Sequence, residues 1–193
     1  MNKTEVLFGT SNKHKLQEAT SIFKGTDIKI THYPVDLLEL QETSLERIAI
    51  FSLKNLPQIG KQIFVEDTGL FIEDLAGFPG PYASHAFKTL GNQGILKLMN
   101  EIENRNAYFE SCVAFRDIKG NIYSFIGRCE GYISNKMQGE FWGFDPIFIP
   151  KDSLNQEKET FSELGDDIKN KLSHRAKALD MLKEFIVSKL PSQ

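Results

Sequence analysis

Short apolar runs and segments of helical periodicity alternate along the first hundred residues, and this alternation restricts the fold more than any other feature. Residues 6–8, 27–33 and 63–65 have the composition of strands. Between them, apolar residues recur three and four positions apart, as on one face of a helix. Strands and helices that alternate in this way predict an α/β sheet.

Two longer β-like runs interrupt the alternation. Residues 108–118 and 122–133 flank the turn Lys119-Gly120-Asn121, which is typical of a β-hairpin. Helical patterns resume at residues 161–170 and after Ser173. We therefore predict an α/β fold in which an elongated mixed β-sheet is flanked by helices, with a lobe that contains the β-hairpin and a central cleft.

Capping residues set the expected starts of the helices. Asn12 follows the first strand, and Thr43 or Ser44 precedes the second helical pattern. Further helices are expected at residues 82–90 and 94–103, the latter capped by Asn92.

Composition excludes several functional classes. With 23 basic and 26 acidic residues the net charge is −3, which argues against a nucleic-acid-binding surface. No apolar run approaches the roughly 18 residues of a membrane span. The first strand-like run begins within a few residues of Met1, so we expect no signal peptide. Cys112 and Cys129 lie in apolar segments without metal-ligand spacing, which indicates buried thiols. We expect a cytoplasmic protein with no membrane or nucleic-acid partner.

Two adjacent acids, Glu66 and Asp67, follow the strand predicted at residues 63–65. Open α/β sheets bind ligands at the carboxyl ends of their strands. Successive side chains of an extended chain point to opposite sides, so we expect only one of the two acids to face the cleft. The alternative is that they serve as a helix cap or as surface charge.

The turn after the first strand has the composition of an anion site. Thr10, Ser11 and Asn12 precede a helix whose first amides would point outward, and Lys13 and Lys15 add positive charge. Cations are unfavourable at a helix N-terminus unless an anion joins them. A solvated basic turn is the alternative.

Aromatic and cationic residues gather in two later segments. Trp142 and Phe144 flank Gly143 and precede Asp145, a pattern suited to stacking on a nucleobase and reading its edge. The alternative for the aromatic pair is a place in the core. A late polar group consists of Lys169, His174 and Arg175.

Five ordered motifs, spread over almost the whole chain, resemble those of the inosine triphosphate pyrophosphatase family. They are Thr10-Ser11-Asn12-Lys13-His14-Lys15, Glu66-Asp67-Thr68-Gly69-Leu70, Gly77-Phe78-Pro79-Gly80-Pro81-Tyr82, Gly143-Phe144-Asp145-Pro146-Ile147-Phe148 and Ser173-His174-Arg175-Ala176. That family hydrolyses non-standard purine nucleoside triphosphates (ITP, dITP, XTP) to the monophosphate and pyrophosphate, which clears them from the nucleotide pool. The resemblance implies a single catalytic domain over residues 1–193, with two lobes around one substrate cleft, and a homodimer.

The resemblance also implies a role for each matching residue. Mg²⁺ would be bound by Glu39 and Asp67, and Asp67 would act as the general base. Lys15 would be a catalytic, phosphate-contacting lysine. The remaining substrate contacts would be Thr10, Ser11, Asn12, Lys13, Thr68, Trp142, Gly143, Phe144, Asp145, Lys169, His174 and Arg175.

Three positions depart from the family pattern. Phe141-Trp142 stands where the family often has Gly-Phe. Phe51-Ser52 stands in the helix that often carries a lysine, and Ala83-Ser84-His85 follows Tyr82 where a basic contact is expected. Two other functions stay open from the residues alone. One is a Maf-like nucleotide pyrophosphatase with another base preference, and the other is a non-catalytic nucleotide-binding protein.

Overall fold

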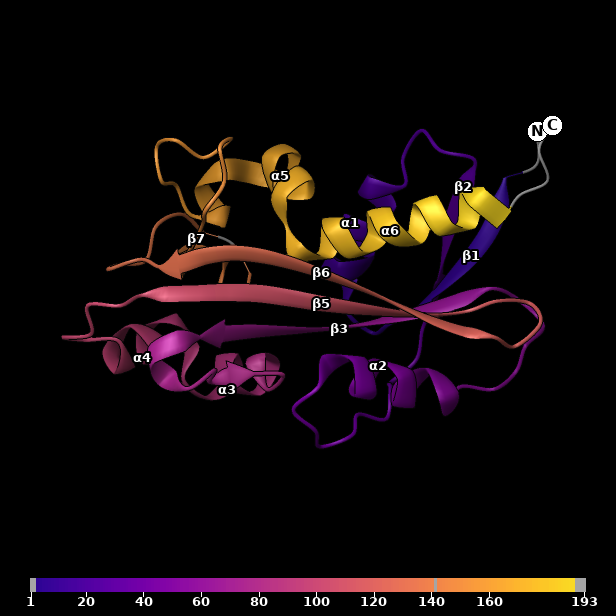
Figure 1. Cartoon of the computed structure of the whole chain (residues 1–193), viewed down its shortest axis with the longest axis horizontal. Helices are drawn as coiled ribbons and strands as arrows, with labels where there is room; N and C mark the ends of the chain where they lie inside the picture. The colour runs from indigo at the N-terminus through magenta and orange to yellow at the C-terminus, as the bar shows by residue number, and fades with distance from the viewer. Residues whose placement is uncertain (1–2, 141, 190–193) are drawn as a thin grey trace. The chain divides into compact units, whose positions relative to one another are not determined.

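The alternating strands build a seven-stranded mixed sheet in the order β2-β1-β3-β5-β6-β7, with β4 paired to β3 (Figure 1). The computed structural model describes residues 3–140 and 142–189. Its chain divides into two units, the first formed by Met1–Asp67, Ser111–Gly127 and Arg175–Gln193, the second by Thr68–Glu110 and Arg128–His174. The α/β fold with a mixed sheet flanked by helices is confirmed, whereas one catalytic domain around a cleft stays a prediction.

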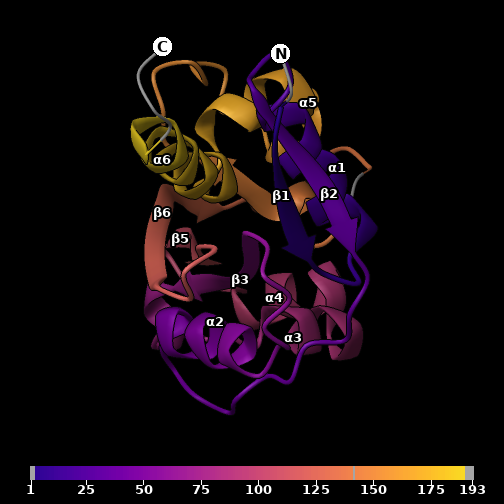
Figure 2. The same ribbon diagram turned by 90° about the vertical axis from the view of Figure 1, so that its right-hand side faces the viewer.

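The first unit contains the parallel part of the sheet. Strand β1 pairs in parallel with β2 and with β3. Helix α1 connects β1 to β2, whereas α1, β2 and α2 lie between β1 and β3, which gives each parallel pair the crossover that it requires. Figures 1 and 2 show α2 and α6 on opposite faces of this part of the sheet. The elements are β1 (Thr4–Gly9), α1 (Lys13–Ile22), β2 (Ile28–Tyr33), α2 (Leu45–Lys54), the start of β3 (Ile63–Ile72), and α6 (His174–Lys189) from its second residue.

The second unit contains the remaining helices and short strands. Figures 1 and 2 show α3 and α4 on one face of its strands and α5 on the other. The elements are the end of β3, the 3-10 turn η1 (Glu73–Leu75), β4 (Pro79–Gly80), α3 (Ala83–Thr89), α4 (Gly91–Leu98), the 3-10 turn η2 (Asp145–Ile147), β7 (Phe148–Pro150) and α5 (Phe161–Leu172).

The predicted hairpin is confirmed. Its strands, β5 (Asn106–Arg116) and β6 (Ile122–Ile133), are neighbours in the sheet, and each belongs in part to both units. In the turn, the amide of Asp117 donates to the carbonyl of Asn121 over 3.0 Å.

Each unit has its own hydrophobic core. The first core joins the inner faces of α1 and α6 to strand residues and includes Val6, Phe8, Ala19, Phe23, Phe64, Val113, Phe115, Leu179, Leu182 and Ile186. The second joins α3, α4 and α5 to strand residues and includes Leu70, Ile72, Ala86, Ile95, Met99, Phe109, Phe144, Phe148, Phe161 and Leu172. Both predicted thiols, Cys112 and Cys129, are buried.

The prediction that a strand ends at residue 65 is wrong, because β3 continues through the two acids to Ile72. Glu66 is buried and Asp67 is half-buried, and neighbouring side chains of a strand point to opposite sides. That only one of them faces a cleft stays a prediction. Beyond them, Leu70 and Ile72 continue the buried face of the strand. Gly69 allows β4 to pair closely, since a Cβ there would lie 2.7 Å from the carbonyl oxygen of Gly80.

The helix starts are partly as predicted. The side chains of Asn12 and Ser44 cap α1 and α2, which confirms two expected caps. The predicted capping role of Asn92 is wrong: Asn92 is the second residue of α4, and its side chain donates to the carbonyl of Gly143 over 3.0 Å. The side chain thus bonds to a residue 51 positions away in the sequence and not to the amides of its own helix. In the described part of the chain, no helix is long and apolar enough to span a membrane.

Candidate active site

A chain of hydrogen bonds shapes the turn between β1 and α1. The Thr10 hydroxyl accepts the Asn12 amide over 3.0 Å, and the Asn12 side chain accepts the amides of His14 and Lys15. From the neighbouring strand, the His32 ring donates through Nε2 to the Thr10 carbonyl over 2.8 Å. The turn is therefore fixed by its own side chains and by β2.

The amides that remain at this turn are those of Ser11 and Lys13. Neither donates a hydrogen bond within residues 3–140 and 142–189. Both side chains are exposed. Because Asn12 already occupies the next two amides, any anion bound here would use the Ser11 and Lys13 amides.

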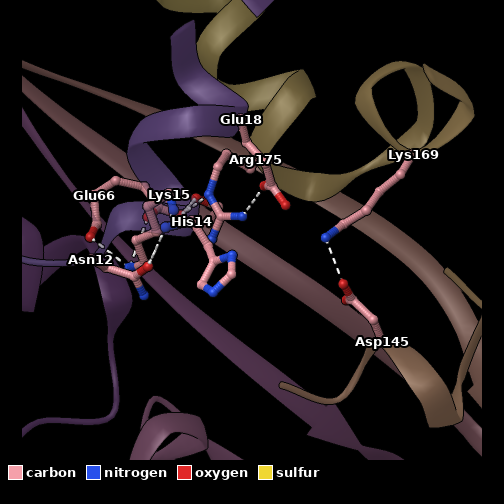
Figure 3. Close-up of polar contacts among 9 residues, drawn as sticks. Asn12, His14, Lys15, Glu18, Glu66, Asp145, Lys169 and Arg175 are labelled. Atoms are coloured by element: carbon pink, nitrogen blue, oxygen red, sulfur yellow. Dashed lines mark hydrogen bonds and ion pairs between the residues drawn. The ribbon is translucent and has the colours of Figure 1, made fainter. Parts of the chain in front are cut away.

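Lys15 points from the first turn of α1 to strand β3. Its ammonium lies 2.8 Å from the Glu66 carboxylate and 3.1 Å from the Glu66 carbonyl oxygen (Figure 3). The Lys15 side chain is 17% exposed, whereas that of Glu66 is 1% exposed. One side of the Lys15 ammonium is thus held by the strand, and the side chain keeps access to solvent.

Glu66 is the centre of a buried group that we call the Glu66 cluster: Lys15, Glu18, Glu66, Ser111 and Arg175. The Arg175 guanidinium lies 3.2 Å from the Glu66 carboxylate through Nε and pairs with Glu18 through its NH1 group. The Ser111 hydroxyl also donates to Glu66. Two cations balance two carboxylates, which is how buried charges are accommodated.

The cluster sets the protonation of Glu66. Burial alone would raise the pKa of the Glu66 carboxyl, but the charges of Arg175 and Lys15, with hydrogen bonds from Lys15 and Ser111, hold that pKa far below its usual 4.5. A carboxylate with so low a pKa is a weak base. Glu66 is therefore suited to orienting Lys15 and Arg175, and it is poorly suited to accepting a proton.

Asp67 and Glu39 differ from Glu66 in their surroundings. Asp67 is half-buried within β3, and Glu39 is exposed in the irregular segment between β2 and α2. Within the described part of the chain, Glu39 makes no hydrogen bond or ion pair. The backbone beside it is anchored, because the buried Ser52 hydroxyl donates to the Leu38 carbonyl over 2.8 Å.

In the second unit, Lys169 connects α5 to the segment 142–145. Its ammonium lies 2.6 Å from the Asp145 carboxylate, and both side chains are buried (Figure 3). The same ammonium lies 5.4 Å from the centre of the Trp142 ring, within cation–π range. Trp142 itself is half-buried. The Lys169 cation, from α5, thus lies beside both the acid and the aromatic ring of the segment 142–145.

Two other predicted residues lie in the second core. Phe144 is 4% exposed and meets the ring of Phe87 edge-on at 5.4 Å. His174 is 3% exposed and stacks on Phe109 at 4.6 Å. Gly143 has φ of +66°, a conformation that favours glycine. Phe144 and His174 therefore have packing roles, and their predicted contacts with a substrate stay predictions.

The predicted residues fall into two groups by unit. The first unit holds Thr10, Ser11, Asn12, Lys13, Lys15, Glu39, Asp67 and Arg175, and the second holds Thr68, Trp142, Gly143, Phe144, Asp145, Lys169 and His174. Thr68 is half-buried in β3, directly after Asp67. Phe141, named above as a departure, lies outside the described residues.

Sequence reasoning missed Glu18 and Ser111. Glu18 lies three residues after Lys15, so helical spacing places both on one face and could have paired them. Ser111 is a small polar residue in a strand that also contains Glu110 and Arg116, so nothing in the sequence singles it out. Their partners lie on other elements of the unit: Ser111 donates to Glu66, and Glu18 pairs with Arg175.

Comparison with known proteins supports the resemblance. The profile of the Ham1 family matches residues 6–185. A "dITP/XTP pyrophosphatase" of Korarchaeum cryptofilum is 44% identical over 183 residues, which are 94% of this chain and 96% of that protein. A protein of the same name from Methanopyrus kandleri is also 44% identical, over 94% of this chain and 95% of its own.

A solved structure agrees with the fold. A HAM1 protein from Coxiella burnetii superposes with a TM-score of 0.81 at 25% identity, over 96% of this chain and 99% of that one. The matches run through almost the full length of both partners. They confirm the resemblance inferred from the five motifs, and the chain belongs to the Ham1 family.

Proposed function

We propose that this protein is a Mg²⁺-dependent nucleoside-triphosphate pyrophosphatase that hydrolyses ITP, dITP and XTP to the monophosphate and pyrophosphate. The observation that carries the proposal is the arrangement at β3. There, Glu66 is bound by two cations and has a depressed pKa, while the adjacent Asp67 is half-buried. Relatives 44% identical over most of their length carry the name dITP/XTP pyrophosphatase.

The first unit supplies the residues for the triphosphate. The amides of Ser11 and Lys13 donate to phosphate oxygens, and the Lys15 ammonium, oriented by Glu66, neutralises charge on the departing pyrophosphate. Asp67 orients the attacking water and accepts its proton as oxygen attacks the α-phosphorus. The α–β phosphoanhydride bond then breaks, and pyrophosphate leaves in one piece.

The residues of the first unit also fit a magnesium ion. No group of three or more His, Cys, Asp or Glu residues suited to a metal occurs in the part of the chain that the structure describes, so a full protein cage is not formed there. Mg²⁺ does not require one, because it is commonly held by one or two carboxylates together with substrate phosphates and water. Glu39 and Asp67 would supply those carboxylates. The bound ion would neutralise phosphate charge.

The second unit supplies the residues for the base. The Trp142 ring offers a stacking surface, worth about 1–3 kcal/mol per base. Asp145 orients the Lys169 ammonium, which would donate to the 6-oxo group of hypoxanthine or xanthine. Adenine carries an amino donor at that position, which cannot accept from the ammonium, and the missing hydrogen bond would cost about 1–3 kcal/mol.

We also propose a homodimer in the cytoplasm. Several large apolar side chains on and beside α3 and α4 are unusually exposed, and a second copy would cover them. They are Tyr82 at 41%, Phe87 at 38%, Leu90 at 43% and Leu98 at 46%. Light scattering after gel filtration would give the mass of a dimer. A single-chain mass at micromolar concentration would contradict it.

A nucleotide panel tests the function. With ITP, dITP and XTP, and with Mg²⁺ present, the first product should be pyrophosphate. Release of orthophosphate would refute the proposed reaction. Preference for a pyrimidine triphosphate would favour a Maf-like enzyme, and ITP binding without turnover would favour a non-catalytic binding protein.

A further inference from the structure

Asn92 makes a contact that neither a helix cap nor a core position explains. It lies in the first turn of α4, and its side-chain amide donates to the Gly143 carbonyl over 3.0 Å. The residue is 8% exposed. This bond joins α4 to the segment 142–145, proposed above to bind the base, and both lie in the second unit.

The bond is made at a cost to stability. While the Asn92 nitrogen donates to Gly143, the Asn92 Oδ1 atom is buried and has no hydrogen-bond partner in the part of the chain that the structure describes. A buried polar atom without a partner destabilises a fold, whereas an apolar side chain of similar size does not. Leucine would therefore serve the packing of α4 at least as well as asparagine.

The segment it holds needs an outside anchor. Gly143 has φ of +66°, and a Cβ at that position would meet nothing within 4 Å, so packing does not fix the glycine itself. On the next residue, Phe144 meets Phe87 of α3 edge-on. Two consecutive residues of the segment are thus held by neighbouring helices: Phe144 packs against α3, and Gly143 accepts a hydrogen bond from α4.

We infer that Asn92 is a positioning residue for the base-binding segment. By fixing the Gly143 carbonyl, it sets the directions of the Trp142 ring on one side and of the Asp145 carboxylate on the other. The consequence for substrate affinity rests on the proposed function. The effect of Asn92 on the conformation of the segment 142–145 is independent of the proposed function.

The sequence offers a direct probe, because Trp142 is the only tryptophan of the chain. Its fluorescence therefore reports on this segment alone. Asn92→Asp keeps the size of the side chain but removes the donor, since an ionised carboxylate can only accept. Asn100→Asp, at an exposed position just after α4, makes the same chemical change elsewhere in the unit and is the matched control.

In the substrate-free protein, we expect Asn92→Asp to shift Trp142 emission to longer wavelength and to increase its quenching by iodide. Asn100→Asp should leave both unchanged. In kinetics with ITP, dITP and XTP, Asn92→Asp should raise KM about three- to tenfold for all three, the factor that one hydrogen bond is worth, with kcat nearly unchanged.

A second variant covers the case in which a carboxylate at residue 92 disturbs folding. Asn92→Leu should unfold at the same temperature as the wild type or higher, yet show the same emission shift and the same rise in KM. Unchanged emission or unchanged KM in this stable variant would overturn the inference. If the wild type hydrolyses none of the three nucleotides, the proposed function has failed, and emission alone then decides whether Asn92 positions the segment.

Discussion

Replacing Glu66 by glutamine would remove the central charge of the Glu66 cluster while keeping the shape of the side chain. Breaking a buried ion pair by removing one partner costs about 3–5 kcal/mol, because the other charge stays buried. Here Arg175 would keep Glu18 as a partner, and Lys15 has access to solvent. We therefore expect the lower end of that range, about 3 kcal/mol in the free energy of unfolding near neutral pH.

The stability lost in Glu66→Gln should depend on pH. The pKa of Glu66 is depressed in the folded protein relative to its usual 4.5, so the ionised carboxylate stabilises the fold above that pH. This stabilisation is lost as the pH falls below 4.5 toward the folded-state value. The difference in the free energy of unfolding between wild type and Glu66→Gln should shrink by about 1.4 kcal/mol per pH unit in that range. The unfolded wild type binds a proton at residue 66 that the folded wild type does not, whereas glutamine binds none in either state.

Urea unfolding, followed by circular dichroism from about pH 7 down to about pH 3.5, measures both quantities. Glu184→Gln changes an exposed carboxylate of α6 and is the control, for which we expect no comparable loss. A stability difference for Glu66→Gln that stays constant across this pH range would refute the assignment of a depressed pKa. A cost at neutral pH no larger than that of the control would refute the buried network itself.

Three further substitutions test the proposed roles. Asp67→Asn should abolish turnover of ITP without unfolding the protein, as measured by pyrophosphate release and circular dichroism; retained activity would place the base elsewhere. Ser52→Ala removes the hydroxyl that holds the Leu38 carbonyl beside Glu39, and should raise the Mg²⁺ concentration for half-maximal activity several-fold, a shift of about 1 kcal/mol. An unchanged Mg²⁺ concentration for half-maximal activity would contradict the proposal that Glu39 binds the metal. Trp142→Ala should raise KM for all purine triphosphates alike, whereas a change selective for one base would contradict a plain stacking surface.

Features with local causes could be predicted from the sequence. Apolar periodicity and turn residues located the hairpin and most helices, and the caps at Asn12 and Ser44 depend on neighbours in sequence. The end of β3 could not be found in this way. Two adjacent acids look like the end of a strand until a partner is known for one of them, and Arg175, which pairs with Glu66, lies 109 residues further along the chain.

The candidate site shows the same division. The first motif selected Lys15 and the late polar group included Lys169, but the acids that orient them, Glu66 and Asp145, could be paired with them only in three dimensions. Asn92 is the clearest case, because asparagine near a helix start usually caps it. Only the fold shows that a carbonyl 51 residues away is its partner.

The division of the chain between its two units has a consequence for synthesis. The chain passes from one unit to the other after Asp67, Glu110, Gly127 and His174. A nascent chain that ends at His174 already contains every segment of the second unit, while the first still lacks the helix that carries Leu179 and Leu182 of its core. On the ribosome the second unit can therefore be completed first. The turn between β1 and α1 precedes every segment of the second unit in the sequence, yet it belongs to the unit that must wait for α6.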